Sequence, residues 1–387
     1  MATIGIDATA LAIPACGGIG ASQYHAMRAL AELDTPHRFV LYAAGPPLVP
    51  FSGRPLDLGW PLRLGAGLAA RSNILWMQTG VNRLLVEDGV DVFWAPRHLL
   101  PFRARGIAKV ATVHDFWERY YPGQQPWLNR TANRLLIAKV MAHADVVVTP
   151  SVATARDAAR FGRVAPGRLR VVPWGVNPSV FRPLPAARIA EVLARLGVES
   201  PYLLSLDVFN PRKNFGAVLE AVSRLPQGSG RPLTVVGIGR PRKTASSAAF
   251  RAQAVSLGLR ARLRVLDDVG SEDLVALYCG ALAFVYPSVY EGFGLPLLEA
   301  MACGCPVITS DRSSLPEVAG DAALLVDPLR PNQLAEAIAR VATEPGEHAR
   351  LAAAGSARVF KFTWRRTAEG MLAAFEQALA ALAGRER

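Results

Sequence analysis

Short apolar segments alternate with amphipathic stretches along the chain, beginning close to the first residue. In the first half, β-type apolar runs occupy residues 3–6, 38–42, 90–94, 109–113, 145–149 and 169–172. Helical periodicity fills the intervals between these runs. The pattern therefore predicts a parallel sheet covered by helices.

The pattern is interrupted once and then restarts. Residues 173–185 contain four prolines and a glycine, which break regular elements, so we place an interdomain linker there. Further candidate strands follow at residues 202–206, 233–236, 263–266, 281–285, 306–309 and 323–326. We expect two Rossmann-like α/β domains, residues 1–182 and 183–364. An amphipathic helix over residues 364–382, within a C-terminal segment of about 365–387, is expected to pack back on the first domain.

The length of 387 residues suits two domains that each bury a core. The longest uncharged apolar stretch, residues 274–290, contains Gly280 and Pro287, so a buried strand explains it better than a membrane span. The first residues lack the order of a signal peptide, which predicts a cytoplasmic protein. The four cysteines, among them Cys16, are expected to be reduced thiols.

The net charge of +12 is concentrated in the first half of the chain. Residues 1–182 carry 20 Lys and Arg against 11 Asp and Glu, whereas residues 183–387 carry 23 against 20. Generic solubility and peripheral contact with the inner face of an anionic membrane explain this excess equally well. A basic helical stretch over residues 128–144 fits a packed surface helix or a membrane-surface helix. No motif indicates nucleic-acid binding.

The segment over residues 290–306 carries the most chemical information. It follows a candidate strand, turns through two glycines and enters a helix with Pro296 near its first position. A helix N-terminus reached through glycines is a site for a diphosphate, because its N–H groups point at the anion. Glu291 and Glu299 stand beside that site, where carboxylates can accept hydrogen bonds from sugar hydroxyls.

The spacing of Glu291, seven residues and Glu299 resembles the E-x7-E signature of a large family of retaining glycosyltransferases, glycosyl transferases group 1. This family includes bacterial mannosyl-, glucosyl- and rhamnosyltransferases. Similar stretches recur in the family's order at residues 17–20, 113–115, 173–177, 181–183, 211–214 and 311–327. The resemblance implies a GT-B fold, in which two Rossmann-like domains face each other across a cleft. The second domain would bind a nucleotide diphosphate-sugar and the first an acceptor.

The resemblance also implies roles for individual residues. Glu291 would contact the donor sugar, Glu299 the nucleotide ribose and His114 the reacting centre. Lys213 and Arg212 would neutralise the departing diphosphate, whose negative charge grows as the glycosidic bond breaks. Backbone contacts to the donor are expected from Gly18, Val269, Gly292, Phe293, Gly294 and Leu295.

Three local patterns are not accounted for by these roles alone. The family commonly has Gly followed by Arg, Thr or Ser where this chain has Asp207 and Val208, which leaves Asp207 without an assigned role. The glycines of residues 17–20 do not continue as a dinucleotide-binding motif, because Gln23 occupies the third glycine position. His114 is either a donor contact or a histidine held structurally by Asp115.

The chain contains no D-x-D sequence, so positive side chains and helix dipoles are expected to hold the diphosphate, without a metal or cofactor. We expect retention through attack on the face from which the leaving group departs, with double displacement through Glu291 less favoured. GDP-mannose is the preferred donor, and a saccharide or lipid-linked glycan is the expected acceptor. The alternatives are a nucleotide-sugar epimerase of similar fold and a non-catalytic nucleotide-sugar-binding protein.

Overall fold

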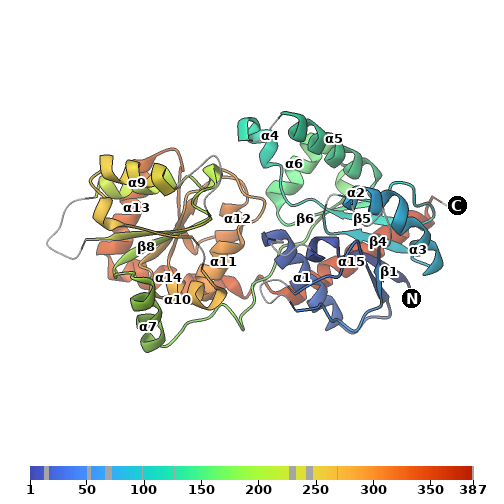
Figure 1. The fold of residues 1–387 in the computed structure, drawn as a ribbon, viewed down its shortest axis with the longest axis horizontal. Coiled ribbons are helices and arrows are strands. Elements are labelled where there is room, and N and C mark those ends of the chain that lie inside the picture. Colours follow the sequence, from blue (N-terminus) through green and yellow to red (C-terminus); the bar gives the residue numbers. More distant parts are fainter. Residues whose placement is uncertain are drawn as a thin grey trace. The chain divides into compact units, whose positions relative to one another are not determined.

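The computed structural model describes residues 1–12, 17–49, 54–65, 72–97, 99–124, 127–225, 232–240, 247–267 and 269–385. The chain divides into two units, each built around a parallel sheet (Figure 1). The first unit comprises Met1–Gly175 and Trp364–Arg387, and the second comprises Val176–Thr363. The expected α/β fold class, with two Rossmann-like parallel-sheet domains, is confirmed.

Among the described residues of the first unit, seven strands pair in the order β3-β2-β1-β4-β5-β6-β7, all parallel. Their bounds are β1 Thr3–Asp7, β2 Arg38–Ala43, β3 Leu62–Leu64, β4 Val92–Ala95, β5 Ala108–Thr112, β6 Val146–Thr149 and β7 Leu169–Val171. Six of these were predicted. The sequence pattern missed β3, because its three residues are all exposed and show no alternation.

The helices of the first unit connect and cover these strands. Their bounds are α1 Gly17–Ala31, α2 Asn73–Leu75, the π-helix η3 Trp76–Gly80, α3 Val81–Glu87, α4 Trp117–Tyr120, α5 Trp127–His143, α6 Val152–Gly162 and the 3₁₀ turns Thr9–Ala12, Pro122–Gln124 and Pro166–Arg168. Helix α1 begins at Gly17, so residues 17–20 form its first turn.

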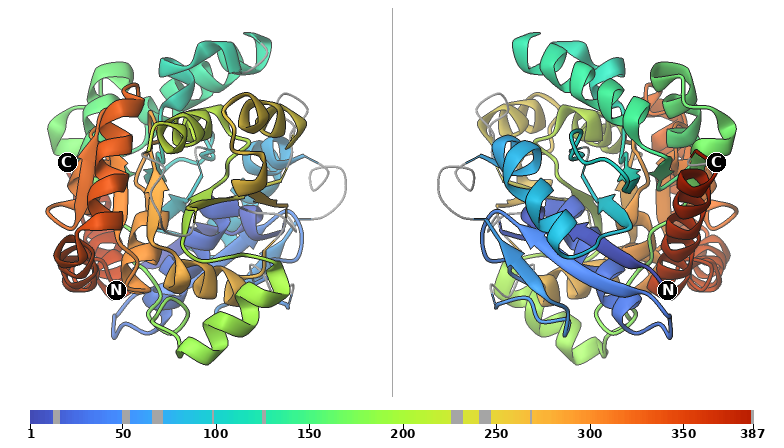
Figure 2. Two further views of the ribbon diagram at one scale, coloured as in Figure 1. Left: turned by 90° about the vertical axis from the view of Figure 1, so that its left-hand side faces the viewer. Right: turned by 90° about the vertical axis from the view of Figure 1, so that its right-hand side faces the viewer.

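The C-terminal helix α15, Trp364–Ala383, packs against the first sheet although it is the last element of the chain (Figure 2). Its buried face contributes Met371 and Phe375 to the core that strands β1, β4, β5 and β6 share. Phe375 lies 5.8 Å from the Trp94 ring, measured between centroids. The predicted amphipathic periodicity of this segment is therefore that of a core-facing helix.

In the second unit the described strands pair in the order β10-β9-β8-β11-β12-β13, again all parallel. Their bounds are β8 Tyr202–Leu206, β9 Thr234–Ile238, β10 Leu263–Leu266, β11 Ala283–Tyr286, β12 Val307–Ser310 and β13 Ala323–Val326. The helices are α7 Ala186–Leu196, α8 Phe215–Ser223, α9 Ser247–Ser256, α10 Ser271–Gly280, α11 Leu295–Ala302, α12 Leu315–Ala319, α13 Pro331–Thr343, α14 Pro345–Val359 and the 3₁₀ turns Pro211–Lys213 and Arg260–Arg262.

The division between the units falls at Gly175, earlier than the expected boundary at residue 182. Residues after Gly175 already belong to the second unit, because Val176 N–H donates to the Phe362 carbonyl at 3.1 Å. Phe181 also packs edge-on against Tyr278, with 6.4 Å between the ring centroids. The proline-rich segment thus includes the first contacts of the second unit.

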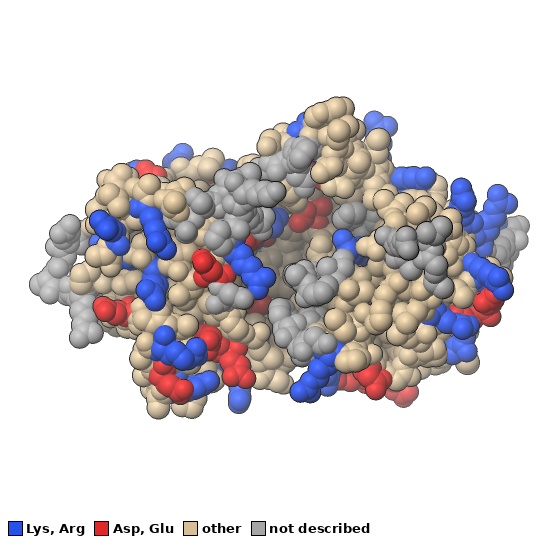
Figure 3. Space-filling model, viewed as in Figure 1, with Lys and Arg blue, Asp and Glu red and all other residues tan. Residues whose placement is uncertain are grey.

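The apolar stretch over residues 274–290 forms most of α10, the buried strand β11 and the start of the loop after β11. No helix in the described part of the chain is long and apolar enough to cross a bilayer. On the face drawn in Figure 3, basic and acidic side chains are interspersed on both units. The excess of positive charge is therefore dispersed over that face instead of forming one block.

Candidate functional site

The predicted site residues of the second unit come from loops at one edge of its sheet. All strands are parallel, so the loops that follow them leave from the same edge. Strands β8 and β11 are hydrogen-bonded neighbours, with Leu204 opposite Phe284. Their pairing places the turn Pro211–Lys213, which follows β8, beside the loop that contains Glu291, which follows β11. Val289 N–H donates to the Arg212 carbonyl at 2.9 Å and joins the two loops.

Lys213 and Glu291 form an ion pair across these loops. Lys213 Nζ lies 2.6 Å from Glu291 Oε1, and each side chain is only 8% exposed. Arg212 approaches the other carboxylate oxygen, with its guanidinium 3.9 Å from Oε2. The structure therefore brings together three residues that the sequence analysis had assigned to neighbouring parts of one site.

The protonation state of the pair follows from its surroundings. Burial alone would raise the pKa of Glu291, but the charges of Lys213 and Arg212 and the hydrogen bonds from Lys213 and Ser288 outweigh burial and hold the pKa at about 2. Burial lowers the pKa of Lys213, against the raising effect of Glu291. The Glu291 carboxylate is thus ionised throughout the neutral pH range and accepts hydrogen bonds only.

Two further residues at this carboxylate were missed by the sequence analysis. Tyr286 Oη donates to Glu291 Oε1 at 3.0 Å, and Ser288 Oγ donates to the same oxygen at 2.6 Å. Lys213 Nζ also donates to Tyr286 Oη. Tyr286 is the last residue of β11, in a run that reads simply as a buried strand. No local pattern distinguishes such a tyrosine from a core residue.

The turn between Glu291 and α11 has a fixed backbone conformation at the start of the helix. Gly294 is the N-cap of α11 with φ of 114°, a conformation that favours glycine, and a Cβ there would lie 2.8 Å from a Leu315 methyl carbon. Ser314 Oγ donates to the carbonyls of Glu291 and Phe293 at 2.9 and 2.7 Å. Gly292, Phe293 and Leu295 belong to the same fixed turn. A helix that begins in this way presents first-turn N–H groups without intrahelical partners.

Glu299 lies in the second turn of α11. Its carboxylate accepts a hydrogen bond from Tyr278 Oη at 3.1 Å. Burial raises the pKa of Glu299 to about 7, and the hydrogen bond from Tyr278 offsets only part of that rise. Glu291 and Glu299 therefore have opposite pKa shifts, because Lys213 and Arg212 lie beside Glu291, whereas burial dominates at Glu299.

The structure explains the unusual Asp207 and Val208. Asp207 follows β8 with φ of 50°, in the left-handed region that glycine adopts at little cost. Its Oδ2 accepts a hydrogen bond from Asn210 Nδ2 at 2.9 Å, while Val208 is 1% exposed and packs in the core. This position thus supplies no basic side chain to the site.

Val269 lies between β10 and α10, at the same edge of the sheet. In the order β10-β9-β8-β11, β10 is two strands from β8 and on the side away from β11. The described contacts do not connect Val269 with Glu291 or Lys213.

The remaining predicted residues, His114 and Gly18, lie in the first unit. His114 Nε2 lies 2.7 Å from the Pro96 carbonyl, which only accepts, so Nε2 carries the proton and Nδ1 is left as an acceptor. Burial lowers the pKa of His114, so its imidazole is neutral at neutral pH. The described hydrogen bond to the ring is made by Pro96, and the negative charge of Asp115 also acts on the ring, because it raises the pKa of His114 against burial. Gly18 is the second residue of α1, and a Cβ there would meet no described atom.

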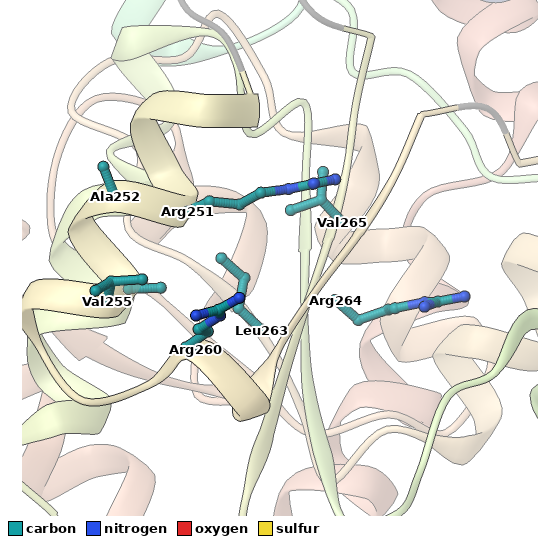
Figure 4. A pocket seen from close by; sticks show the side chains of 8 residues that line it. Arg251, Ala252, Val255, Arg260, Leu263, Arg264 and Val265 are labelled. Atoms are coloured by element: carbon teal, nitrogen blue, oxygen red, sulfur yellow. The ribbon is translucent and has the colours of Figure 1, made fainter.

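An Arg-lined groove of about 510 Å³ lies elsewhere on the second unit, between α9 and the edge strand β10 (Figure 4). Arg251 and Arg260 are exposed on its rim. Arg264 points away from the groove and donates to the Leu196 carbonyl at 3.0 Å. The positive side chains of the groove therefore do not converge on one point, whereas Lys213 and Arg212 both lie beside Glu291.

Two family models match the two halves of the chain. Residues 194–358 match the model described as glycosyl transferases group 1, and residues 16–180 match glycosyltransferase family 4. The first match contains Lys213, Glu291 and Glu299 together with the strands that position them. The second unit therefore carries a group 1 glycosyltransferase domain.

Curated relatives of this glycosyltransferase include several mannosyltransferases. It is 39% identical to O-antigen chain mannosyltransferase B of Escherichia coli over 166 residues, 42% of each chain. It is 29% identical to the MMP alpha-(1->4)-mannosyltransferase of Mycolicibacterium hassiacum, over 74% of this chain and 69% of the relative. A D-inositol 3-phosphate glycosyltransferase of Acidothermus cellulolyticus is 33% identical, over 63% of this chain and 55% of the relative. The matched segments thus span between 42% and 69% of these relatives' lengths.

Solved structures resemble the glycosyltransferase over nearly its whole length. Sucrose-phosphate synthase from Thermosynechococcus elongatus aligns with a TM-score of 0.77 and 22% identity, covering 98% of this chain and all of that one. Anabaena HepE, solved in complex with UDP and glucose, aligns with a TM-score of 0.74 and 17% identity, covering 96% and 99% of the two chains. At these identities the likeness concerns the fold, which is GT-B.

Proposed function

We propose that the chain transfers a hexose from a nucleotide diphosphate-sugar, bound by the second unit, to a hydroxyl of an acceptor. The observation that carries this proposal is the fixed Glu291 carboxylate, which stands directly before the turn into α11. The α11 N-terminus and Arg212 would hold the diphosphate, with Gly292, Phe293, Gly294 and Leu295 forming the turn around it. Because Lys213 already donates to Glu291, it would serve both the carboxylate and the leaving group.

The two carboxylates suit different hydroxyl groups of the donor. Glu291 is ionised and has its Oε1 occupied by three protein donors, so Oε2 is the oxygen that would accept from a sugar hydroxyl. Glu299, with its raised pKa, would accept from the ribose hydroxyls. Val269, beyond β10, would contact the nucleotide base through its backbone.

The geometry around Glu291 favours one retaining mechanism over the other. A carboxylate with a pKa of about 2 and three hydrogen bonds on one oxygen is a weak nucleophile, so double displacement through Glu291 is disfavoured. We infer that the bond between sugar C1 and the diphosphate oxygen breaks as C1 bonds to the acceptor oxygen on the same face. The acceptor proton then passes to the leaving diphosphate oxygen.

Positive side chains would neutralise the leaving diphosphate without a metal ion. The sequence contains no D-x-D, and Arg212 and Lys213 supply two cations at the loop that would meet the leaving group. In the first unit, the Nδ1 atom of His114 would accept a hydrogen bond from a substrate hydroxyl, and Gly18 would offer its backbone at the start of α1.

GDP-mannose is the preferred donor, and a saccharide or a lipid-linked glycan is the preferred acceptor. The mannosyltransferases among the curated relatives support this preference. The relatives named D-inositol 3-phosphate glycosyltransferase leave other acceptors open.

Peripheral contact with an anionic membrane is proposed for helix α5. Its exposed face carries Trp127, Leu128 and Leu135, which are 65%, 62% and 67% exposed. The helix contains Arg130, Arg134 and Lys139 but no acidic residue. An apolar stripe on a cationic helix can enter the headgroup region of a bilayer.

The experiment is a transfer assay with a panel of GDP-, UDP- and dTDP-sugars and saccharide acceptors, with products and their anomeric configuration determined by NMR. We expect α-configured product from an α-configured donor. The variants Glu291→Ala and Lys213→Ala should lose about a hundredfold or more in kcat, whereas Glu336→Ala, an exposed glutamate on α13, should retain activity. Sugar isomerisation without an acceptor would identify an epimerase. Nucleotide-sugar binding without turnover would identify a non-catalytic binder.

A further inference from the structure

The loop between β12 and α12, residues 311–314, lies against the turn that leads from Glu291 into α11. Strand β12 pairs in parallel with β11, so the loops that follow these two strands leave the same edge of the sheet. Two consecutive serines of this loop, Ser313 and Ser314, hydrogen-bond the main chain of the turn. The loop after β12 therefore has a direct means of fixing the conformation of the turn.

Ser313 binds both polar main-chain atoms of Glu291. Its Oγ accepts a hydrogen bond from the Glu291 N–H at 3.3 Å and donates to the Glu291 carbonyl oxygen. A hydroxyl has one proton, so the Glu291 carbonyl takes the only hydrogen bond that Ser313 can donate. One side chain thus orients the peptide groups on both sides of the Glu291 Cα atom.

Ser314 binds the next part of the turn and is fully buried. Its Oγ donates to the carbonyl oxygens of Glu291 and Phe293, at 2.9 and 2.7 Å. A carbonyl oxygen that faced an anion would repel it. The turn directs these two oxygens to the serines and leaves the first-turn N–H groups of α11 for an anion.

The backbone of Ser313 has a conformation that serine disfavours. Its φ is 58°, in the left-handed region that glycine adopts at little cost and residues with a Cβ do not. Strained residues of this kind are frequent at functional sites, where the surrounding structure holds them. The residue type that suits this backbone lacks the hydroxyl that binds Glu291, so strain and hydrogen bonding can be separated by experiment.

The segment that follows the serines is itself held in place. Leu315 is fully buried, and one of its methyl carbons would lie 2.8 Å from a Cβ on Gly294. At the other end of α12, Arg358 donates to the Val318 carbonyl at 2.9 Å and also to the Glu317 carbonyl. Because these contacts hold α12 at both ends, removing one serine hydroxyl should free the turn without displacing the loop.

We propose that Ser313 is a positioning residue of the donor site and acts through the main chain of Glu291. The side-chain partners of Glu291 hold its carboxylate, whereas Ser313 fixes its two peptide groups. Ser313 thereby sets the direction of the carboxylate toward the sugar and of the following turn toward the diphosphate. This inference rests on the proposed function, in which these two groups bind the donor.

The test compares two variants of Ser313 in the full chain. Ser313→Gly removes the hydroxyl and relieves the left-handed backbone, whereas Ser313→Ala removes the hydroxyl and keeps the strain. The urea midpoint of unfolding should therefore be lower in Ser313→Ala than in Ser313→Gly. The affinity for GDP or UDP, whichever binds the wild type more tightly, should fall about fivefold to tenfold in calorimetric titration, equally in both variants.

A purely structural role of Ser313 predicts a different result. Affinity would then follow stability, so Ser313→Gly would bind the nucleotide as the wild type does. Wild-type affinity in Ser313→Gly would overturn the proposal, whatever the affinity of Ser313→Ala. In the transfer assay, the KM for the donor should rise by about the same fivefold to tenfold in both variants, while the KM for the acceptor stays unchanged.

Two matched variants control for general effects of these substitutions. Ser205→Ala removes another buried serine hydroxyl of the second unit, which donates to the Val285 carbonyl at 2.8 Å. Arg163→Gly relieves another left-handed residue, with φ of 51°, at the end of α6 in the first unit. Ser205→Ala should lower the unfolding midpoint and Arg163→Gly should not, and neither should change the nucleotide affinity.

Nucleotide binding by the wild type distinguishes this inference from the proposed function. Failure of the wild type to bind either nucleotide would reject the proposed function and the role of Ser313 together. Binding by the wild type with unchanged affinity in Ser313→Gly would reject the role of Ser313 alone and leave the transfer reaction standing. Weaker binding in both Ser313 variants, with both controls unchanged in affinity, is the result that the proposal predicts.

Discussion

Lys213 Nζ donates to Glu291 Oε1 over 2.6 Å, and this contact joins the loop after β8 to the loop after β11. Both side chains are buried, and Tyr286 and Ser288 share the same carboxylate oxygen. The pair therefore belongs to the structure of the second unit as well as to its chemistry. Removing one partner should therefore lower both the stability of the second unit and its activity, and the two losses can be measured separately.

Lys213→Met should destabilise the second unit by about 3–5 kcal/mol, because it removes the hydrogen-bonded cation of the buried Glu291 carboxylate and leaves Arg212 at 3.9 Å. The double variant Lys213→Met/Glu291→Leu should recover much of that loss while remaining inactive. Urea unfolding followed by circular dichroism measures both. All seven tryptophans lie in the first unit, so their fluorescence is an internal control and should not shift. A double variant as unstable as the single one would contradict this account of the pair.

The raised pKa of Glu299 predicts a stability that depends on pH. A carboxyl whose pKa is about 7 when folded, against an ordinary value of 4.5, contributes stability that is fully present below pH 4.5 and is lost as the pH rises through 7. Glu299→Gln should therefore stabilise the second unit by about 1–3 kcal/mol at pH 8 relative to wild type, and by little at pH 4.5. Unfolding midpoints of wild type and Glu299→Gln at the two pH values test this prediction. A lower stability of Glu299→Gln than of wild type at pH 8 would contradict the raised pKa of Glu299.

The same shift predicts how donor binding responds to pH. Ionised Glu299 accepts from more hydroxyls than the protonated acid, so the KM for the donor should rise as the pH falls below about 7. In Glu299→Gln the KM should be higher throughout and lack this dependence. If the pH profile of KM is the same in both proteins, Glu299 does not take part in donor binding.

The left-handed backbone at Asp207 predicts an unusual substitution pattern. Asp207→Gly should leave stability within about 1 kcal/mol of wild type, since glycine adopts φ of 50° at little cost and this gain offsets the lost hydrogen bond with Asn210. Asp207→Ala loses that hydrogen bond and keeps the strained backbone, so it should be less stable than Asp207→Gly by about 1 kcal/mol. Equal stabilities in denaturant unfolding would show that the backbone strain is absent.

The exposed stripe on α5 predicts binding to anionic vesicles. Replacing Trp127, Leu128 and Leu135 together by Ser should reduce co-sedimentation with phosphatidylglycerol-containing vesicles about tenfold or more. Val86→Ser, an equally exposed apolar position on α3, is the control and should have no effect. Wild-type protein that does not sediment with these vesicles would leave α5 as an ordinary surface helix.

The strands and the position of Glu291 before a helix N-terminus were predictable, because each follows from a local pattern in the sequence. Apolar runs identify buried parallel strands, and all but the exposed β3 were found in this way. The partners of Glu291 were not predictable, because Tyr286 and Ser288 act through a carboxylate whose position depends on the pairing of β8 with β11. The left-handed backbone at Asp207 and the Pro96 carbonyl that orients His114 were not predictable either, because no local sequence pattern indicates them.

Calorimetric titration of the full chain with GDP and UDP tests the central claim most directly, because it requires neither the sugar nor the acceptor to be known. The account predicts saturable binding of at least one of them to the wild type, and binding about tenfold or more weaker to Glu299→Ala, with Glu336→Ala unchanged. Absence of binding by either nucleotide at millimolar concentration, or equal affinity in wild type and Glu299→Ala, would contradict it.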